Sequence, residues 1–281
     1  MQNSRLREQI RVFTRNRTSL VGVIVLLVLI FMAVFVSWIA PHDPLKQNPY
    51  YTLRSPNTEF LLGTDFYGRD ILSRMLWGAR VSLAVGILSV MIGMIVGSLI
   101  GMIAALAGGR LGNLLMRTVD IFLCFPSEVF AILVLVILGQ GLFKLILAIG
   151  LTMTPRFSRL SYGSTLSVKE RDFIDASYAI GAKAPRIISK HIAPNILGEI
   201  LVISSLWTAT SIRVEANLSF LGLGVAPPTP TWGNMVNLGV QHLTIAPWVS
   251  LFPGLAIMLA ILAFNLIGDG MRDVLDPKMY N

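Results

Sequence analysis

The stretch VSLAVGILSVMIGMIVGSLIGMIAALA, residues 81–107, decides the fold, because it contains no charged side chain and is long enough to cross a lipid bilayer. The rest of the 281-residue chain has the same character: 54% of its residues are hydrophobic, 14% are charged, and the mean hydropathy is +0.70. Soluble globular proteins carry about 25% charged residues. These values exclude a soluble globular protein, a single-anchor protein and a small extracellular domain. They predict an all-α, polytopic membrane protein.

Six apolar segments are expected to form transmembrane helices, with both chain termini in the cytoplasm. The fourth is the shortest, and we include it because the segment after it is rich in Lys and Arg, which is typical of a cytoplasmic loop. Most of the Lys and Arg residues lie on the cytoplasmic side in this topology. The six segments are residues 19–40, 81–107, 120–139, 145–153, 196–212 and 248–267.

These segments divide the chain into five parts. The first span is not a cleaved signal peptide, because its apolar run exceeds the about 7–15 residues of such peptides and no small-x-small site follows it. The core contains a basic cytoplasmic loop at about residues 156–195. The parts are a cytoplasmic tail (1–18), the first span (19–40), an extracytoplasmic loop (41–80), a five-helix core (81–268) and a second cytoplasmic tail (269–281).

Small and charged residues within the spans suggest three structural roles. Gly93, Gly97 and Gly101 recur every fourth residue on one face and predict close packing against another helix, within this bundle rather than against another chain. Pro126 predicts a kink in the third span rather than a proton relay through its flanking acids. Arg213 and Glu215 lie near the outer end of the fifth span, where they are expected to anchor the interface or to line a solute path.

Several kinds of chemistry find no support in the sequence. Cys124 is the single cysteine and the three histidines are scattered, so neither an internal disulfide nor a metal site is expected. No basic stripe interleaved with aromatic residues indicates nucleic-acid binding. No Gly-x-x-x-x-Gly-Lys-Ser/Thr run is present to hold ATP phosphates. We therefore expect no catalytic residues and no cofactor on this chain.

The cytoplasmic segment SVKERDFIDASYAIGAKAPRIISKHIAP, residues 167–194, predicts two short helices. The first covers about residues 169–180 and ends at Gly181, and the second begins at Pro185. Pro194 is expected to separate the second helix from the fifth span. Two short amphipathic helices on a membrane protein need a surface to pack against, which is either the lipid or a partner.

Four motifs in this chain resemble those of one transporter family. Asp175-Ala176-Ser177, with Gly181, His191 and Pro194 after it, resembles the EAA loop of bacterial ABC-importer permeases, with Asp in place of Glu and Ser in place of the second Ala. The other motifs resemble the C-type inner-membrane subunit of the dipeptide, oligopeptide and nickel permeases, which also carries an extra first span. They are GTDFYGRDILSR (63–74), LSFLGLGVAPPTPTWG (218–233) and FNLIGDGMRDVLDP (264–277).

The resemblance implies a type I ABC-importer permease fold in the bacterial inner membrane, and specific partners. The chain would form a heterodimer with a second, homologous permease, bind two cytoplasmic ATPase subunits or domains, and receive solute from an extracytoplasmic solute-binding protein. The expected solute is a di- or oligopeptide, with nickel, a metal chelate or glutathione as alternatives. The residues implied to couple the chain to the ATPase are Asp175, Ala176, Ser177, Gly181, His191 and Pro194.

Two other functions remain open at this point. An ion-coupled secondary transporter would be expected to carry internal repeats and acidic residues near the middle of its spans. Most acidic residues of this chain lie instead in loops and at the ends of spans. A membrane scaffold or assembly factor is the other alternative, and it would not need a coupling loop.

Overall fold

The computed structural model describes residues 16–275, and this part of the chain is helical apart from loops and one isolated bridge between Thr64 and Asp70. The predicted all-α class is confirmed. The longer helices are α2 (Arg17–Val34), α4 (Ile71–Ala107), α5 (Gly109–Leu123), α6 (Ser127–Leu138), α7 (Leu142–Lys169), α10 (Ala193–Phe220) and α12 (Trp248–Leu275). The shorter ones are α3 (Val36–Ile39), η1 (Pro49–Tyr51), α8 (Asp172–Ala179), α9 (Ala184–Ile187), the π-helical turn η2 (Ile188–Ile192) and α11 (Trp232–Val240).

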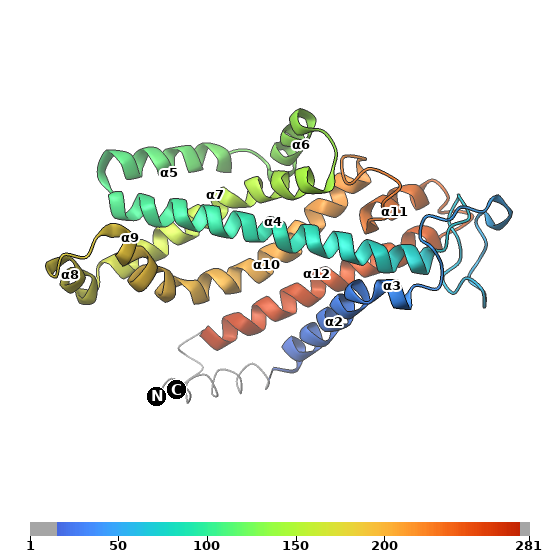
Figure 1. Ribbon diagram of the computed structural model, residues 1–281, viewed down its shortest axis with the longest axis horizontal. Helices are drawn as coiled ribbons and strands as arrows, with labels where there is room; N and C mark the ends of the chain where they lie inside the picture. The colour runs from blue at the N-terminus through green and yellow to red at the C-terminus, as the bar shows by residue number, and fades with distance from the viewer. Residues whose placement is uncertain (1–15, 276–281) are drawn as a thin grey trace.

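The long helices lie side by side and give the described part of the chain two distinct ends (Figure 1). One end carries α8 and α9, and we call it the α8 end. The other carries α11 and the loop that joins α3 to α4, and we call it the α11 end. Helices α2 and α10 run toward the α11 end, whereas α4, α7 and α12 run toward the α8 end (Figure 1).

Within residues 16–275, four helical stretches are long and apolar enough to cross a membrane on their own, namely Arg17–Val34, Ile71–Ala107, Ala184–Phe220 and Trp248–Val274. The pair α5 and α6 raises the number to five if the two count as one broken span. The predicted fourth span lies in α7, which is 28 residues long but is not among these candidates. Several spans are therefore present, whereas the number six remains a prediction.

The third span, expected over residues 120–139 with a kink at Pro126, is bent more sharply than expected. The chain there forms α5 and α6, which meet at an angle of 93° across a break of at most four residues. Pro126 directly precedes α6 and cannot donate a backbone hydrogen bond, so a helix cannot continue normally through it. The break is thus a sharp turn rather than a kink.

Other boundaries also differ from the predicted ones. Helix α4 begins at Ile71 rather than Val81, because the Asp70 side chain caps it by accepting a hydrogen bond from the Ser73 backbone N–H at 2.8 Å. Helix α7 continues past Pro155 to Lys169, so the first part of the expected loop at about residues 156–195 is helical. The first span is interrupted at Phe35, and α12 extends into the predicted tail. Residues 1–15 and 276–281, which include Asp276 and Pro277 of the last motif, lie outside the described residues.

The glycine stripe of α4 packs against α7, as predicted for a contact within the bundle. A Cβ atom added at Gly93 would lie 2.6 Å from Cβ of Met153. At Gly97 and Gly101 it would collide with the backbone oxygens of Thr154 and Ser158. Because the two backbones approach so closely, α7 is held along much of its length by α4.

Candidate functional site

Helix α8 projects from the α8 end of the bundle (Figure 1), and buried residues on one side hold it there. Ile174 is fully buried and belongs to the same hydrophobic cluster as Val168 of α7 and Ile187 of α9. Ser177 is also buried, and its hydroxyl donates to the Phe173 carbonyl at 2.7 Å. The side chains of Asp175 and Ala176 point away from this anchor and are exposed.

Gly181 ends α8 with a backbone conformation that favours glycine. Its φ is +80°, in the left-handed region. The Gly181 N–H donates to the Tyr178 carbonyl at 2.9 Å, and the Ala182 N–H donates to the Ser177 carbonyl at 3.0 Å. These bonds satisfy carbonyls that the helix end would leave unpaired. The predicted helix stop is confirmed, and nothing lies within 4 Å of a Cβ built at Gly181, so this turn is open to a partner.

The segment after Gly181 differs from the prediction at Pro194. That residue lies in the first turn of α10, where its missing N–H costs no helical hydrogen bond, and it does not separate two helices. Residues 184–220 form one continuous helical stretch that includes the π-helical turn. His191 is half-buried on this stretch, and its ring lies 6.3 Å from the ring of Phe173.

The outward side of α8 is apolar. Phe173 is 39% exposed, Tyr178 43% and Ile180 85%. Ser177 points into the anchor, whereas Phe173 and Ile180 point outward. We call the exposed set Phe173, Asp175, Ala176, Tyr178 and Ile180 the coupling face, because exposed apolar groups clustered on a short helix mark a contact surface.

Arg213 and Glu215 have different surroundings, as their spacing of two residues predicts. Arg213 on α10 is half-exposed and forms an ion pair with Glu128 of α6 at 3.3 Å. Nearby, Arg156 of α7 donates to the Ser127 hydroxyl at 3.1 Å. A second ion pair joins Arg159 of α7 to Asp120 of α5 at 3.0 Å. These charged groups join the bent pair α5–α6 to the rest of the bundle.

Glu215 is fully buried among the described residues. Its carboxylate accepts a hydrogen bond from the Ser219 hydroxyl at 2.7 Å. Ser82 of α4 and Thr231, which precedes α11, lie beside it. Glu215 therefore joins α10 to α4 and to the start of α11.

The loop at the α11 end contains a buried charge cluster that sequence reasoning missed. Asp65 accepts a hydrogen bond from Arg69 Nε at 2.7 Å, and Arg74 Nε lies 3.5 Å from the same oxygen. All three side chains are at most 6% exposed. Gly63 and Gly68, which flank Asp65, have φ values of +77° and +68° and turn the chain back on itself. The spacing of Asp65 and Arg69 was the available signal, since these residues, Arg74 and both glycines belong to the motif at 63–74.

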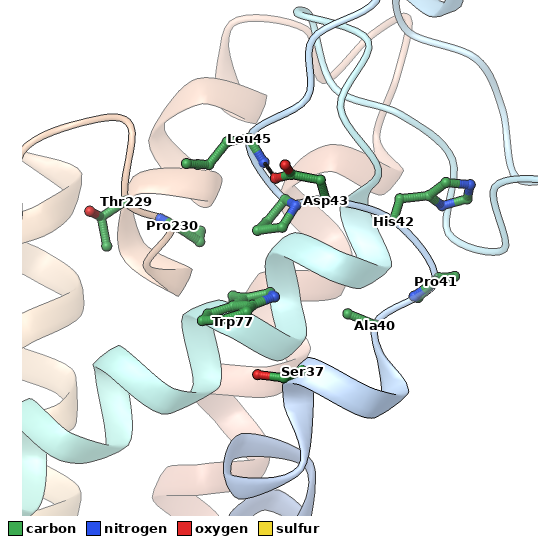
Figure 2. A pocket seen from close by; sticks show the side chains of 10 residues that line it. Ser37, Ala40, Pro41, His42, Asp43, Leu45, Trp77, Thr229 and Pro230 are labelled. Carbon is green, nitrogen blue, oxygen red and sulfur yellow. Dashed lines mark hydrogen bonds between the residues drawn. The ribbon is translucent and has the colours of Figure 1, made fainter.

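A cavity with a volume of about 660 Å³ lies at the α11 end (Figure 2). Trp77 of α4 and Pro230 of the loop before α11 lie on its walls, while His42 points away from them. Asp43 is the one acidic residue that lines it, and its carboxylate is occupied in accepting a hydrogen bond from the Leu45 N–H at 2.8 Å. Within residues 16–275, no group of three or more His, Cys, Asp or Glu side chains is arranged to hold a metal ion.

Comparison with known proteins identifies relatives over nearly the whole chain. Residues 97–281 match the family described as binding-protein-dependent transport system inner membrane component, and residues 4–56 match the N-terminal TM domain of oligopeptide transport permease C. The chain is 40% identical, over 99% of its length and 94% of the relative's, to the di/tripeptide transport system permease protein DppC of Pseudomonas aeruginosa. It is also 42% identical to the glutathione transport system permease protein GsiD of Escherichia coli, over 96% of its own length and 89% of the relative's.

A structural relative has the same fold. An inward-facing structure of the MetNI methionine ABC transporter contains a chain that aligns with a TM-score of 0.59 at 19% identity. The alignment covers 73% of the present chain and 98% of the other.

Proposed function

The chain belongs to the inner-membrane components of binding-protein-dependent transport systems, and from this premise we propose that it is one of two different permease subunits of an ATP-driven peptide importer. It is a multi-pass permease of the inner membrane. This family assignment excludes the two alternative functions, an ion-coupled secondary transporter and a membrane scaffold. A second permease, two ATPase subunits or domains and a solute-binding protein would complete the assembly, and ATP would bind to the ATPase chains.

The coupling face supports contact with the ATPase. Asp175 and Ala176 are exposed there, and Gly181 leaves open space at the end of α8. Ile174 and Ser177 fix the opposite side of α8 to the bundle. A force applied to α8 would therefore be transmitted to α7 and to the helical stretch 184–220, which carries His191 and Pro194. This arrangement is the observation that carries the proposal.

The proposal also implies how the chain is oriented in the membrane. The α8 end would face the cytoplasm, together with both chain termini. In support, the Asn16 amide donates to the Asp273 carboxylate at 3.0 Å, so the start of α2 lies beside the end of α12. The basic residues of the α8 loop also favour a cytoplasmic position.

We assign the solute to the di- and tripeptide class, because the DppC relative is aligned over 99% of this chain. Glutathione, itself a tripeptide derivative, is the second candidate, since the GsiD relative is 42% identical. Arg213 and its partner Glu128 would face the solute path, where two exposed opposite charges suit a zwitterionic peptide.

The test is peptide uptake by the complete importer reconstituted in proteoliposomes. Gly181→Asp places a side chain where φ is +80° and adds a carboxylate to the open turn that the ATPase would contact. We expect uptake to be abolished while the variant still inserts and assembles. Wild-type uptake by a stably inserted Gly181→Asp importer would contradict the coupling role.

A matched control is Gly109→Asp. Gly109 also has a positive φ, +49°, and also has nothing within 4 Å of a built Cβ, but it lies at the junction of α4 and α5 and outside α8. Peptide uptake by the Gly109→Asp importer is expected to stay near that of the wild type. Native mass spectrometry of each assembly checks composition: one copy of this chain, one different permease and two ATPase chains. Isolation of the chain alone or as a homodimer would contradict the proposed assembly.

A further inference from the structure

A second cavity at the α11 end lies between the outer loop, the start of α4 and the segment that contains α11. Its volume is about 420 Å³, within the range of roughly 300–1,000 Å³ that is usual for small-molecule sites. It is open on one side, where Gln47 is exposed. Its polar lining consists of Gln47, Tyr67, Arg69, Arg74, Asn234 and Asn237, beside the turn at Pro227–Pro228.

The charges around this cavity do not balance. Arg69 and Arg74 both line it, although only 5% and 3% of their side chains are exposed. No Asp or Glu is among the described residues that line it. Asp65 lies behind the two arginines and is the single carboxylate paired with them. Two buried guanidinium groups thus share one carboxylate, and an uncompensated buried charge is costly.

The hydrogen-bond donors are also not all used. Arg74 Nη1 donates to the Pro44 carbonyl at 2.9 Å, and the guanidinium of Arg69 lies 4.5 Å from the centre of the Tyr67 ring. In the described part of the chain, Nη2 of Arg69 is buried and has no hydrogen-bond partner. Asn234 and Asn237 donate their amide N–H groups to the carbonyls of Val225 and Phe220. Among the described residues, the cavity therefore offers positive charge and one guanidinium donor, Arg69 Nη2, that has no hydrogen-bond partner.

We propose that this cavity binds a carboxylate group of the incoming peptide before the peptide enters the membrane path. This inference rests on the proposed function. A carboxylate is the anion that peptides always carry, and the planar guanidinium group binds it with paired, charge-assisted hydrogen bonds. An acidic side chain of the solute-binding protein has the same chemistry, so the experiment has to distinguish the two sources.

Gln47 is the position to change, because Arg69 and Arg74 also hold Asp65 and their loss would disturb the loop itself. Gln47→Glu changes almost only charge and places a carboxylate at the mouth of the cavity. Gln47→Lys places a positive charge there instead. Tyr50→Glu is the control: Tyr50 is 88% exposed on the same loop and is not among the residues that line this cavity.

Uptake of radiolabelled trialanine is measured in proteoliposomes that contain the complete importer, with the binding protein saturated with trialanine. We expect Gln47→Glu to lower the uptake rate about tenfold and Gln47→Lys not to lower it. The concentration of binding protein that gives half-maximal ATPase stimulation should stay unchanged in both. Tyr50→Glu should behave like the wild type.

Each remaining outcome overturns a defined part of the inference. If Gln47→Glu raises the half-maximal concentration of binding protein, the carboxylate belongs to that protein and not to the solute. If Gln47→Glu transports at the wild-type rate, the cavity binds no carboxylate during transport. If the correctly assembled wild-type importer transports no peptide at all, the proposed function itself fails.

Discussion

At the scale of single residues, the GTDFYGRDILSR motif owes its structure to Asp65. This carboxylate accepts hydrogen bonds from the backbone N–H groups of Tyr67 and Arg69, at 2.8 and 3.0 Å, besides its contacts with the two arginines. Asp70 caps the start of α4, and Arg74, four residues later on the same helix, belongs to the charge cluster. The motif therefore joins a tight turn, a helix start and a charge cluster in one short segment.

Asp65→Asn should destabilise the loop at the α11 end strongly. The change removes the one carboxylate paired with Arg69 and Arg74, and breaking a buried ion pair costs about 3–5 kcal/mol. The expected result is a lower thermal unfolding midpoint of the purified importer and faster proteolysis within residues 41–70. Asp43→Asn is the control, because the Asp43 side chain is exposed and an asparagine oxygen can still accept from the Leu45 N–H. An equal effect of both variants would contradict the special role of Asp65.

At the scale of elements, the contact between α4 and α7 explains how a helix with a polar second half is held in the bundle. Glycines on α4 let the backbone of α7 approach, and the Ser161 hydroxyl of α7 donates to the Ser98 carbonyl of α4 at 2.9 Å. Small residues and hydrogen bonds of this kind drive helix association within membranes. The sequence pattern predicted the close approach, but it did not identify α7 as the partner helix.

Gly97→Ala should weaken this contact. A Cβ at Gly97 would collide with the Thr154 carbonyl and lie 2.7 Å from Cβ of Phe157, so the helices must separate. Overpacking of this kind costs about 1–3 kcal/mol. Gly163→Ala on α7 is the matched control, because nothing lies within 4 Å of a Cβ built there and Ala favours a helix over Gly. Thermal unfolding in detergent should show a lower midpoint for Gly97→Ala alone, and equal midpoints would contradict the packing.

At the scale of the whole molecule, the open question is the number of membrane crossings. Helix α7 runs from the α11 side of the bundle toward the α8 end (Figure 1). It carries Arg156 and Arg159 at positions that a single span would expose to lipid, but both side chains have partners on α5 or α6. A polar helix held between other helices can cross a membrane without passing a test of apolar length.

Reporter fusions decide whether α7 crosses. A reporter fused after Gln140, before α7, should appear outside, and one fused after Gly181 should appear in the cytoplasm. A fusion after Pro230 should again appear outside. Alkaline phosphatase and green fluorescent protein activities give opposite readouts for the two sides. The same location for the fusions after Gln140 and Gly181 would overturn the crossing by α7 and with it the six-span topology.

The sequence by itself determined the class of this protein, its family and the end of a helix at Gly181. Apolar length and the ending of a helix at Gly181 depend on neighbours in the chain, so they can be deduced from residue order alone. The helix boundaries were less predictable: α4 begins at a cap, Asp70, and α7 continues through Pro155. Pro194 continues rather than separates helical structure, because it lies in the first turn of α10, where its missing N–H costs no helical hydrogen bond.

Only the tertiary structure decided which charges meet. Arg213 pairs with Glu128, which lies 85 positions away in the chain, while Glu215, two residues on, is buried beside Ser219. Arg69 and Arg74 line a cavity whose other wall comes from residues 222–238. Charge compensation and burial depend on segments that are distant in sequence, and local patterns do not report them.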